Sequence, residues 1–128
     1  MKKILITGAY GFVGTNLALS LKDKYELWAL DVAEVQEGLY SRFYTWSQLD
    51  KIPFNDIDTI IHLAGKAHDT KNKAETQSYF SVNTGLTQKI FDKFIVSDSR
   101  SFIFLVLLKL QQILLRVKNL QRMLCLNQ

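Results

Sequence analysis

Short apolar runs alternate with longer periodic segments along most of the chain. Short runs that predict strands lie at 4–6, 25–30, 42–46 and 100–104, and the segment 58–69 is expected to contain a further strand. Residues 12–21 and 73–95 have the spacing of helices, and the segment 47–58 predicts a short helix with a turn at Pro53. Strands that alternate with helices are typical of an α/β fold. We expect a doubly wound parallel sheet of the Rossmann type in residues 1–104, in the order 3-2-1-4-5.

The segment after the first strand predicts a helix with one apolar face. The residues assigned to that face are Phe12, Val13, Leu17, Leu19 and Leu21. A polar loop follows the second strand, and no repeat or low-complexity linker interrupts the chain. The pattern therefore predicts a single domain.

Three glycines follow the first strand in the spacing TGxxGxxG. Gly8 permits a tight turn, Gly11 lets a pyrophosphate approach the backbone, and Gly14 lets the helix pack closely. The phosphates would lie at the N-terminus of the helix, against free N–H groups and the positive end of the dipole. Asp31 lies 23 residues after Gly8, where a carboxylate binds ribose hydroxyls and repels a 2′-phosphate. The pattern predicts dinucleotide binding and favours NAD over NADP.

Three ordered motifs carry a family resemblance. They are TGAYGFVG at 7–14, DTIIHLAGKAHD at 58–69 and SVNTGLTQKIFD at 81–92. Together they resemble the extended short-chain dehydrogenase/reductases, the NAD-dependent epimerase/dehydratase family that acts on sugar nucleotides. The resemblance covers residues 1–104. One departure is the pair Thr45-Trp46, which stands where the family often has an Asp and a hydrophobic residue near the adenine.

The resemblance implies a cofactor site and a type of reaction. The residues it places at NAD are Gly8, Gly11, Phe12, Gly14, Asp31, Val32, Leu63, Ala64, Gly65 and Asn83. In the family, a Tyr abstracts a hydroxyl proton of a nucleotide-linked sugar while hydride passes to NAD. The parent protein is accordingly expected to be a cytoplasmic homodimer that binds a nucleotide sugar. Epimerase, dehydratase and reductase activities all remain open.

Other polar residues near these motifs have ordinary explanations beside the functional ones. We expect His62 to end a strand with a structural hydrogen bond, and Lys66 to face solvent. His68 and Asp69 either belong to a solvated loop or border the substrate cleft. No metal site is predicted, since the single Cys125 excludes a cysteine-based zinc site.

Residues 105–128 do not continue the pattern. They contain no Gly, Pro, Asp or Glu. In the family the fifth strand ends in a Ser/Thr-rich stretch, and a YxxxK pair follows whose Lys lowers the pKa of the Tyr. None of the five Tyr residues here has Lys four positions later. We therefore expect this chain to be catalytically incompetent.

An origin for this tail is suggested by back-translating residues 102–128 into one of the codon sets that can encode them. If a single T is inserted into the run of T after residue 102, the new frame reads FIFFSSVKAAADSVEGEKLTEDVVPKP, which resembles the family's strand end and the stretch before its Tyr. The genetic code leaves little choice for most of the bases that the shifted frame uses. The tail is thus interpreted as out of frame and the domain as truncated. The alternative is an amphipathic helix for a membrane or a partner, with its apolar stripe at Leu110, Ile113, Leu114, Val117, Leu120 and Leu124.

The charge distribution separates the same two regions. Residues 1–98 hold 11 Lys/Arg and 12 Asp/Glu, whereas residues 99–128 hold five Lys/Arg and no acid, so the net charge of +4 comes from the tail. The basic residues are not clustered with aromatics in the body, which argues against nucleic-acid binding. No apolar run has transmembrane length, and no signal peptide is predicted. Two further hypotheses are a non-catalytic NAD-binding or regulatory module and a remnant without function.

Overall fold

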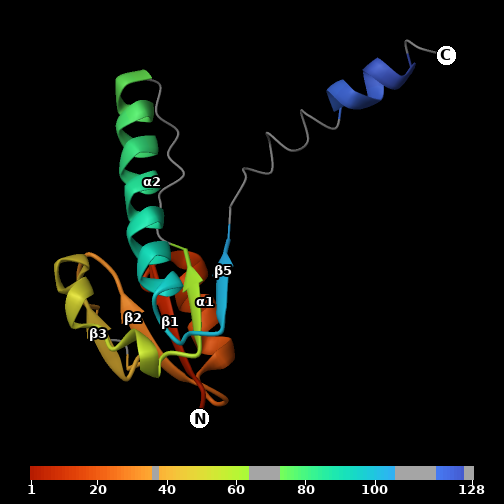
Figure 1. Cartoon of the computed structure of the whole chain (residues 1–128). Coiled ribbons are helices and arrows are strands. Elements are labelled where there is room, and N and C mark those ends of the chain that lie inside the picture. The colour runs from red at the N-terminus through yellow and green to blue at the C-terminus, as the bar shows by residue number, and fades with distance from the viewer. Residues whose placement is uncertain (36–37, 64–72, 106–117, 126–128) are drawn as a thin grey trace.

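The computed structural model describes residues 1–35, 38–63, 73–105 and 118–125, with side chains from 83 onward in the long helix. Five parallel strands form one sheet in the order β3-β2-β1-β4-β5 (Figure 1). Their bounds are Lys3–Thr7 (β1), Glu26–Leu30 (β2), Arg42–Tyr44 (β3), Thr59–His62 (β4) and Ser101–Phe104 (β5). Leu5 of the central strand pairs with Trp28 on one side and Ile60 on the other. The predicted α/β class and strand order are confirmed.

Two α-helices and two short 3₁₀-helices connect the strands. They are α1 (Phe12–Leu21), η1 (Trp46–Lys51), η2 (Phe54–Asp56) and α2 (Lys73–Ile95). The third strand is two residues shorter than predicted, because Thr45 precedes η1 and donates its backbone N–H to the side chain of Gln48. A residue that caps a helix in this way cannot continue the strand ladder. The long helix α2 rises past the carboxyl ends of the strands (Figure 1).

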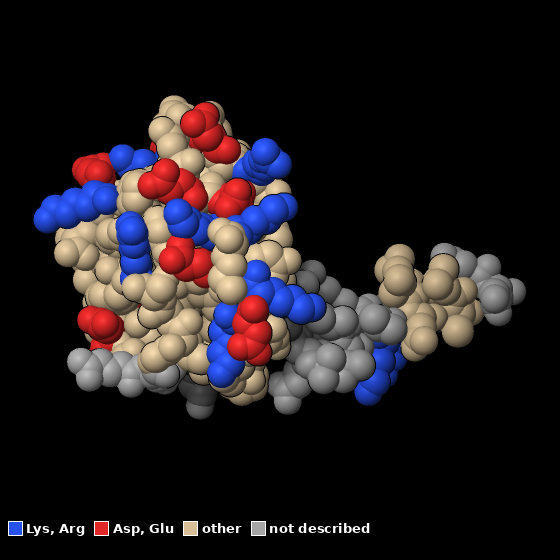
Figure 2. All heavy atoms as spheres, turned by 90° about the horizontal axis from the view of Figure 1, so that it is seen from below, with Lys and Arg blue, Asp and Glu red and all other residues tan. Residues whose placement is uncertain are grey.

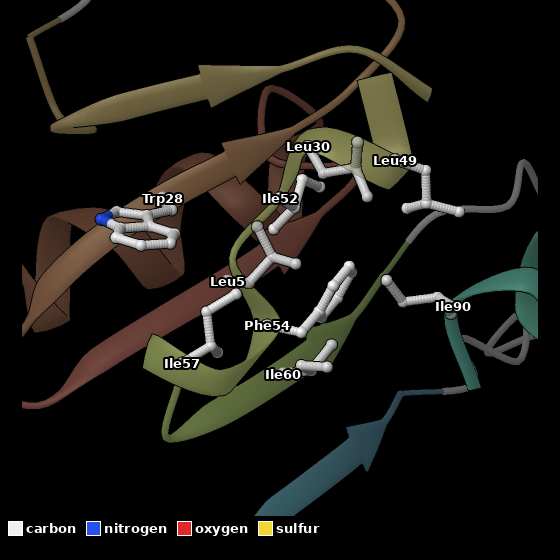
Figure 3. Close-up of a cluster of buried hydrophobic side chains, with 9 residues drawn as sticks. All are labelled: Leu5, Trp28, Leu30, Leu49, Ile52, Phe54, Ile57, Ile60 and Ile90. Carbon is white, nitrogen blue, oxygen red and sulfur yellow. The ribbon is translucent and has the colours of Figure 1, made fainter. Parts of the chain in front are cut away.

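Each face of the sheet has its own core, because alternate side chains of a strand point to opposite faces. On one face Leu5, Trp28 and Ile60 pack with η1, η2 and Ile90 of α2 (Figure 3). On the other face, Ile6 and Ala18 belong to a cluster beneath α1. The central strands are therefore covered on both sides, as their continuous apolar runs predict.

The predicted apolar face of α1 is wrong in two positions. Phe12 is 86 % exposed and Leu19 is 49 % exposed, whereas Gly14 and Ala18 are the buried residues of the helix. Positions 14 and 18 are four apart and share one side of the helix, while 12 and 19 are rotated away from it. Small residues thus face the sheet and allow a close approach.

The last strand and the tail are much less covered. Ile103 and Phe104 are about half exposed, and Leu105 is 42 % exposed. A helical stretch at 118–125, which Figure 1 draws apart from the sheet, has every residue exposed. Of the alternative apolar stripe, Leu120 and Leu124 are solvent-exposed, and its other members lie outside the described residues. Within the described ranges, no helix is both long and apolar enough to cross a membrane.

Candidate functional site

The glycine loop begins where β1 ends. Gly8 has a φ of +67°, a left-handed conformation that favours glycine. Its N–H donates to the carbonyl of Leu30 at 2.9 Å, and the N–H of Gly11 donates back to the carbonyl of Gly8 at 3.1 Å. The loop is therefore a tight turn anchored to the end of β2. It brings the N-terminus of α1 to the carboxyl edge of the sheet.

Gly11 and Gly14 lie so close to the backbone of the loop that a side chain would crowd or overlap it. A Cβ added to Gly14 would lie 2.5 Å from the carbonyl oxygen of Ala9 and 2.6 Å from that of Gly8. A Cβ on Gly11 would lie 3.3 Å from the oxygen of Gly8. Gly14 is thus required by the loop packing against the first turn of α1. Since the first N–H groups of a helix have no partner within it, this turn offers donors to an anion.

Asp31 lies directly after β2 and faces the glycine loop. Its Oδ2 accepts the backbone N–H of Tyr10 at 2.9 Å, and its Oδ1 accepts the N–H of Val32 at 2.7 Å. Each carboxylate oxygen retains a further lone pair for an external hydroxyl. The side chain is partly exposed, so the arrangement presents a negative charge beside the anion-binding turn. A carboxylate in this position can accept hydrogen bonds from neighbouring hydroxyls and repels a further anion.

Tyr40 supports the loop from outside and was not predicted as a site residue. Its hydroxyl lies 2.7 Å from the carbonyl oxygen of Ala9 and 3.2 Å from that of Gly14. Its ring packs edge-on against the ring of Tyr10, with 5.4 Å between centroids. These contacts join residues 26 to 31 positions apart, so no local pattern in the sequence indicates them. Tyr40 holds the backbone that the cofactor would approach.

His62 ends β4 and is fully buried. Its Nδ1 lies 2.6 Å from the hydroxyl of Thr7, and its Nε2 lies 2.9 Å from the hydroxyl of Thr87. Burial lowers the pKa of His62 from 6.5 to about 4, so the ring is neutral at pH 7. The predicted structural hydrogen bond at this residue is confirmed. No role was predicted for either threonine, although Thr7 opens the glycine motif and Thr87 belongs to the motif that contains Asn83.

Four other predicted site residues lie within the described residues. Val32 and Phe12 are both largely exposed, and Leu63 follows His62 at the end of β4. Asn83 lies in α2, and its carbonyl accepts the hydroxyl of Thr87 at 2.9 Å. The six residues 64–69 of the second motif fall outside the described residues, and they include Ala64, Gly65, Lys66, His68 and Asp69.

Other features of the described residues offer less chemistry. No group of His, Cys, Asp and Glu within the described ranges is placed to hold a metal ion. A shallow hollow of about 640 Å³ lies at the opposite edge, between the amino ends of β1 and β2 and the segment 38–41. Figure 2 shows this end of the molecule, with Lys/Arg and Asp/Glu interspersed over the surface. The glycine turn and Asp31 therefore remain the candidate site.

Comparison with known proteins agrees with this geometry. A sequence model of the NAD dependent epimerase/dehydratase family matches residues 4–106. The chain belongs to this family. The UDP-glucose 4-epimerase of Vibrio cholerae is 32 % identical over 116 residues, which cover 84 % of this chain and 35 % of that protein. The chain thus spans about a third of the length of this relative.

Solved structures share the fold at lower identity. The UDP-N-acetylglucosamine 4-epimerase from Bacillus cereus superposes with a TM-score of 0.65 at 24 % identity, over 81 % of this chain and 35 % of that one. The UDP-glucose 4-epimerase from Brucella ovis, solved in complex with NAD, gives a TM-score of 0.65 at 21 % identity, with the same shares. At these identities the likeness establishes the fold, which is the Rossmann-type sheet of the family.

Proposed function

We propose that this chain is an NAD-binding unit of a nucleotide-sugar epimerase, dehydratase or reductase. The observation that carries the proposal is the position of Asp31, whose carboxylate accepts the N–H of Tyr10 within the glycine loop. A ribose acceptor and a phosphate-binding helix turn are thereby adjacent, as an adenosine diphosphate moiety requires. The cofactor would contact Gly8, Gly11, Phe12, Gly14, Asp31, Val32, Leu63, Ala64, Gly65 and Asn83.

The cofactor fits what the described residues offer. At Gly11 a Cβ would lie only 3.3 Å from the oxygen of Gly8, so glycine keeps the turn tight, and the first turn of α1 contains no acidic residue that would compete with a phosphate. The exposed side chains of Phe12 and Val32 supply apolar surface at the same edge. NAD supplies a hydride acceptor when it is bound. The residues of this chain bind and orient the cofactor, and Asp31 selects against a 2′-phosphate.

A titration with a matched pair of variants tests this assignment. NAD and NADP are titrated into the full chain by calorimetry, and NAD is expected to bind more tightly. Asp31→Ala should weaken NAD binding by about 1–3 kcal/mol, the range for losing a charged hydrogen-bond partner. Asp31→Asn keeps an acceptor for Tyr10 but loses the charge, so it should reduce the preference for NAD over NADP. Equal affinities in all three proteins would remove Asp31 from the site.

We further propose that the chain is catalytically incompetent and that residues 105–128 are out of frame. This rests on the missing YxxxK pair and on the exposure of every residue in 118–125. The family match, which stops at 106, is consistent with it. Purified chain should convert no nucleotide sugar, and reproducible turnover above a buffer blank would contradict the proposal. The whole protein would be a cytoplasmic homodimer that acts on a nucleotide-linked sugar.

The second candidate is a non-catalytic NAD-binding or regulatory module. The exposed apolar residues Leu120, Met123 and Leu124 favour it, since they offer a surface to a partner. The nucleotide sequence distinguishes the two candidates. An intact YxxxK segment in another frame downstream of codon 104 supports the broken enzyme, and an early stop codon in that frame supports the module.

A further inference from the structure

The hydrogen bonds around His62 determine which ring nitrogen carries the proton. The hydroxyl of Thr87 donates to the carbonyl of Asn83 at 2.9 Å, so its single hydrogen is already used. Toward Nε2 of His62, at 2.9 Å, the same hydroxyl must therefore act as an acceptor. Nε2 consequently carries the proton, and Nδ1 of the neutral ring is an acceptor.

The other side of the ring is consistent with this tautomer. The hydroxyl oxygen of Thr7 accepts the backbone N–H of Leu63 at 3.1 Å. Its hydrogen is then directed to Nδ1 of His62, at 2.6 Å. A directional chain results, from the Leu63 N–H through Thr7, His62 and Thr87 to the Asn83 carbonyl. Along this chain, the hydroxyls of Thr7 and Thr87 each accept from the preceding group and donate to the next.

The plane of the ring is fixed as well. The ring of Phe104 in β5 stacks on His62 at 5.4 Å with 19° between planes, and Trp46 of η1 lies edge-on at 6.5 Å. Rotation of the imidazole would break both hydrogen bonds and both ring contacts. His62 is thus held in one orientation by β1, β5, η1 and α2.

This chain of hydrogen bonds reaches three segments that surround the proposed cofactor. Thr7 immediately precedes Gly8 of the glycine loop, Leu63 directly follows β4, and Asn83 lies in α2. We propose that His62 is a positioning residue for NAD, which sets the glycine loop, the backbone at Leu63 and α2 relative to one another. This inference rests on the proposed NAD site. Binding groups must be held within about 0.5 Å of their productive geometry, which makes such a connection consequential.

Two substitutions of threonine to valine in the same helix provide the test. Thr87→Val removes the acceptor of the His62 Nε2–H, whereas Thr84→Val makes the same change at an exposed position. The monomeric fraction of the full chain is titrated with NAD. Thr87→Val should raise the Kd for NAD by about 3- to 10-fold, the effect expected for one neutral hydrogen bond. Thr84→Val should leave it unchanged, and Thr87→Ser should restore most of the affinity because it retains the hydroxyl.

A spectroscopic readout separates positioning from stability. A long-range ¹H–¹⁵N spectrum of the two histidines, with His62 assigned by its loss in His62→Asn, should show the Nε2–H tautomer in the unmodified chain and a mixture in Thr87→Val. If valine prevents folding, Thr87→Ala takes its place, since alanine is the best helix former.

The outcomes are distinct. An Nδ1–H tautomer in the unmodified chain overturns the hydrogen-bond chain, whether or not NAD binds. NAD binding that Thr87→Val leaves within twofold, even with a lowered unfolding midpoint, overturns the positioning role alone. An unmodified chain that binds no NAD overturns the proposed function and the positioning role with it.

Discussion

Strands β1 and β5 are similar in sequence and differ in surroundings. Leu5 and Ile6 of β1 have no exposed surface, because strands flank β1 on both sides and helices cover both faces. Ile103 of β5 is 47 % exposed, and β5 pairs only with β4 among the described strands. Apolar composition therefore predicts a strand, but the neighbours determine how much that strand contributes to stability.

The same difference separates the site from the tail. The glycine loop follows directly after β1. Because the side chains of β1 are closely packed, they have few alternative conformations and hold the start of the loop in place. Residues 118–125 follow the most exposed strand, and each of them is exposed. β5 and the residue after it contact His62 in two ways, because Phe104 stacks on the imidazole ring and the N–H of Leu105 donates to the His62 carbonyl at 3.3 Å. The glycine turn is thus packed at the centre of a sheet whose edge strand is largely exposed.

The largest expected effect is a loss of stability on truncating a side chain of β1, compared with an equivalent truncation in β5. Leu5→Ala should lower the free energy of unfolding by about 3 kcal/mol, because it leaves a cavity between η2 and the sheet. Ile103→Ala should lower it by less than about 1 kcal/mol, since half of the side chain is already in water. Urea denaturation followed by circular dichroism measures both. Equal losses would mean that β5 is covered as well as β1.

A second pair of variants compares the glycine loop with α2. Gly14→Ala should destabilise the chain by about 1–3 kcal/mol, because its Cβ would overlap the backbone of the loop. Gly85→Ala should instead stabilise it by about 0.5–1 kcal/mol, since nothing lies within 4 Å of that Cβ and glycine is unfavourable inside a helix. Thermal unfolding of both variants gives the signs. A stable Gly14→Ala protein would show that the loop can move away from α1.

The pH dependence of the free energy of unfolding tests the burial of His62, which ends β4 and contacts Thr7 of β1 and Phe104 of β5. Because burial depresses the folded-state pKa of His62 to about 4, the unfolded chain binds a proton first as the pH falls below 6.5. Stability should therefore be constant above pH 7 and decrease by about 2 kcal/mol between pH 7 and pH 5. Denaturant midpoints at several pH values, with an NMR titration of His62, measure this. A folded-state pKa near 6.5 would contradict the buried neutral ring.

Much of the fold was predictable from the sequence, and the reasons are local. The apolar runs predict the strands, and the TGxxGxxG spacing predicts the turn and the start of α1. Asp31 marks the end of β2, so each of these signals lies within a short segment. The exposure of Phe12 and Leu19 was not predicted, because hydrophobicity alone does not identify which side of a short helix meets the sheet. The roles of Tyr40 and Thr87 depend on contacts across 25 or more residues, which no local pattern encodes. The sequence likewise suggests an out-of-frame tail, which requires the nucleotide sequence to test.

The central claim is that residues around the glycine loop bind NAD and that the tail takes no part. Amide hydrogen exchange of the full chain, measured with and without saturating NAD, tests it most directly. We predict slower exchange at residues 8–14, 31–32 and 63 on addition of NAD, and rapid, unchanged exchange at 118–125. Protection of the tail by NAD, or no protection at the glycine loop, would contradict the account.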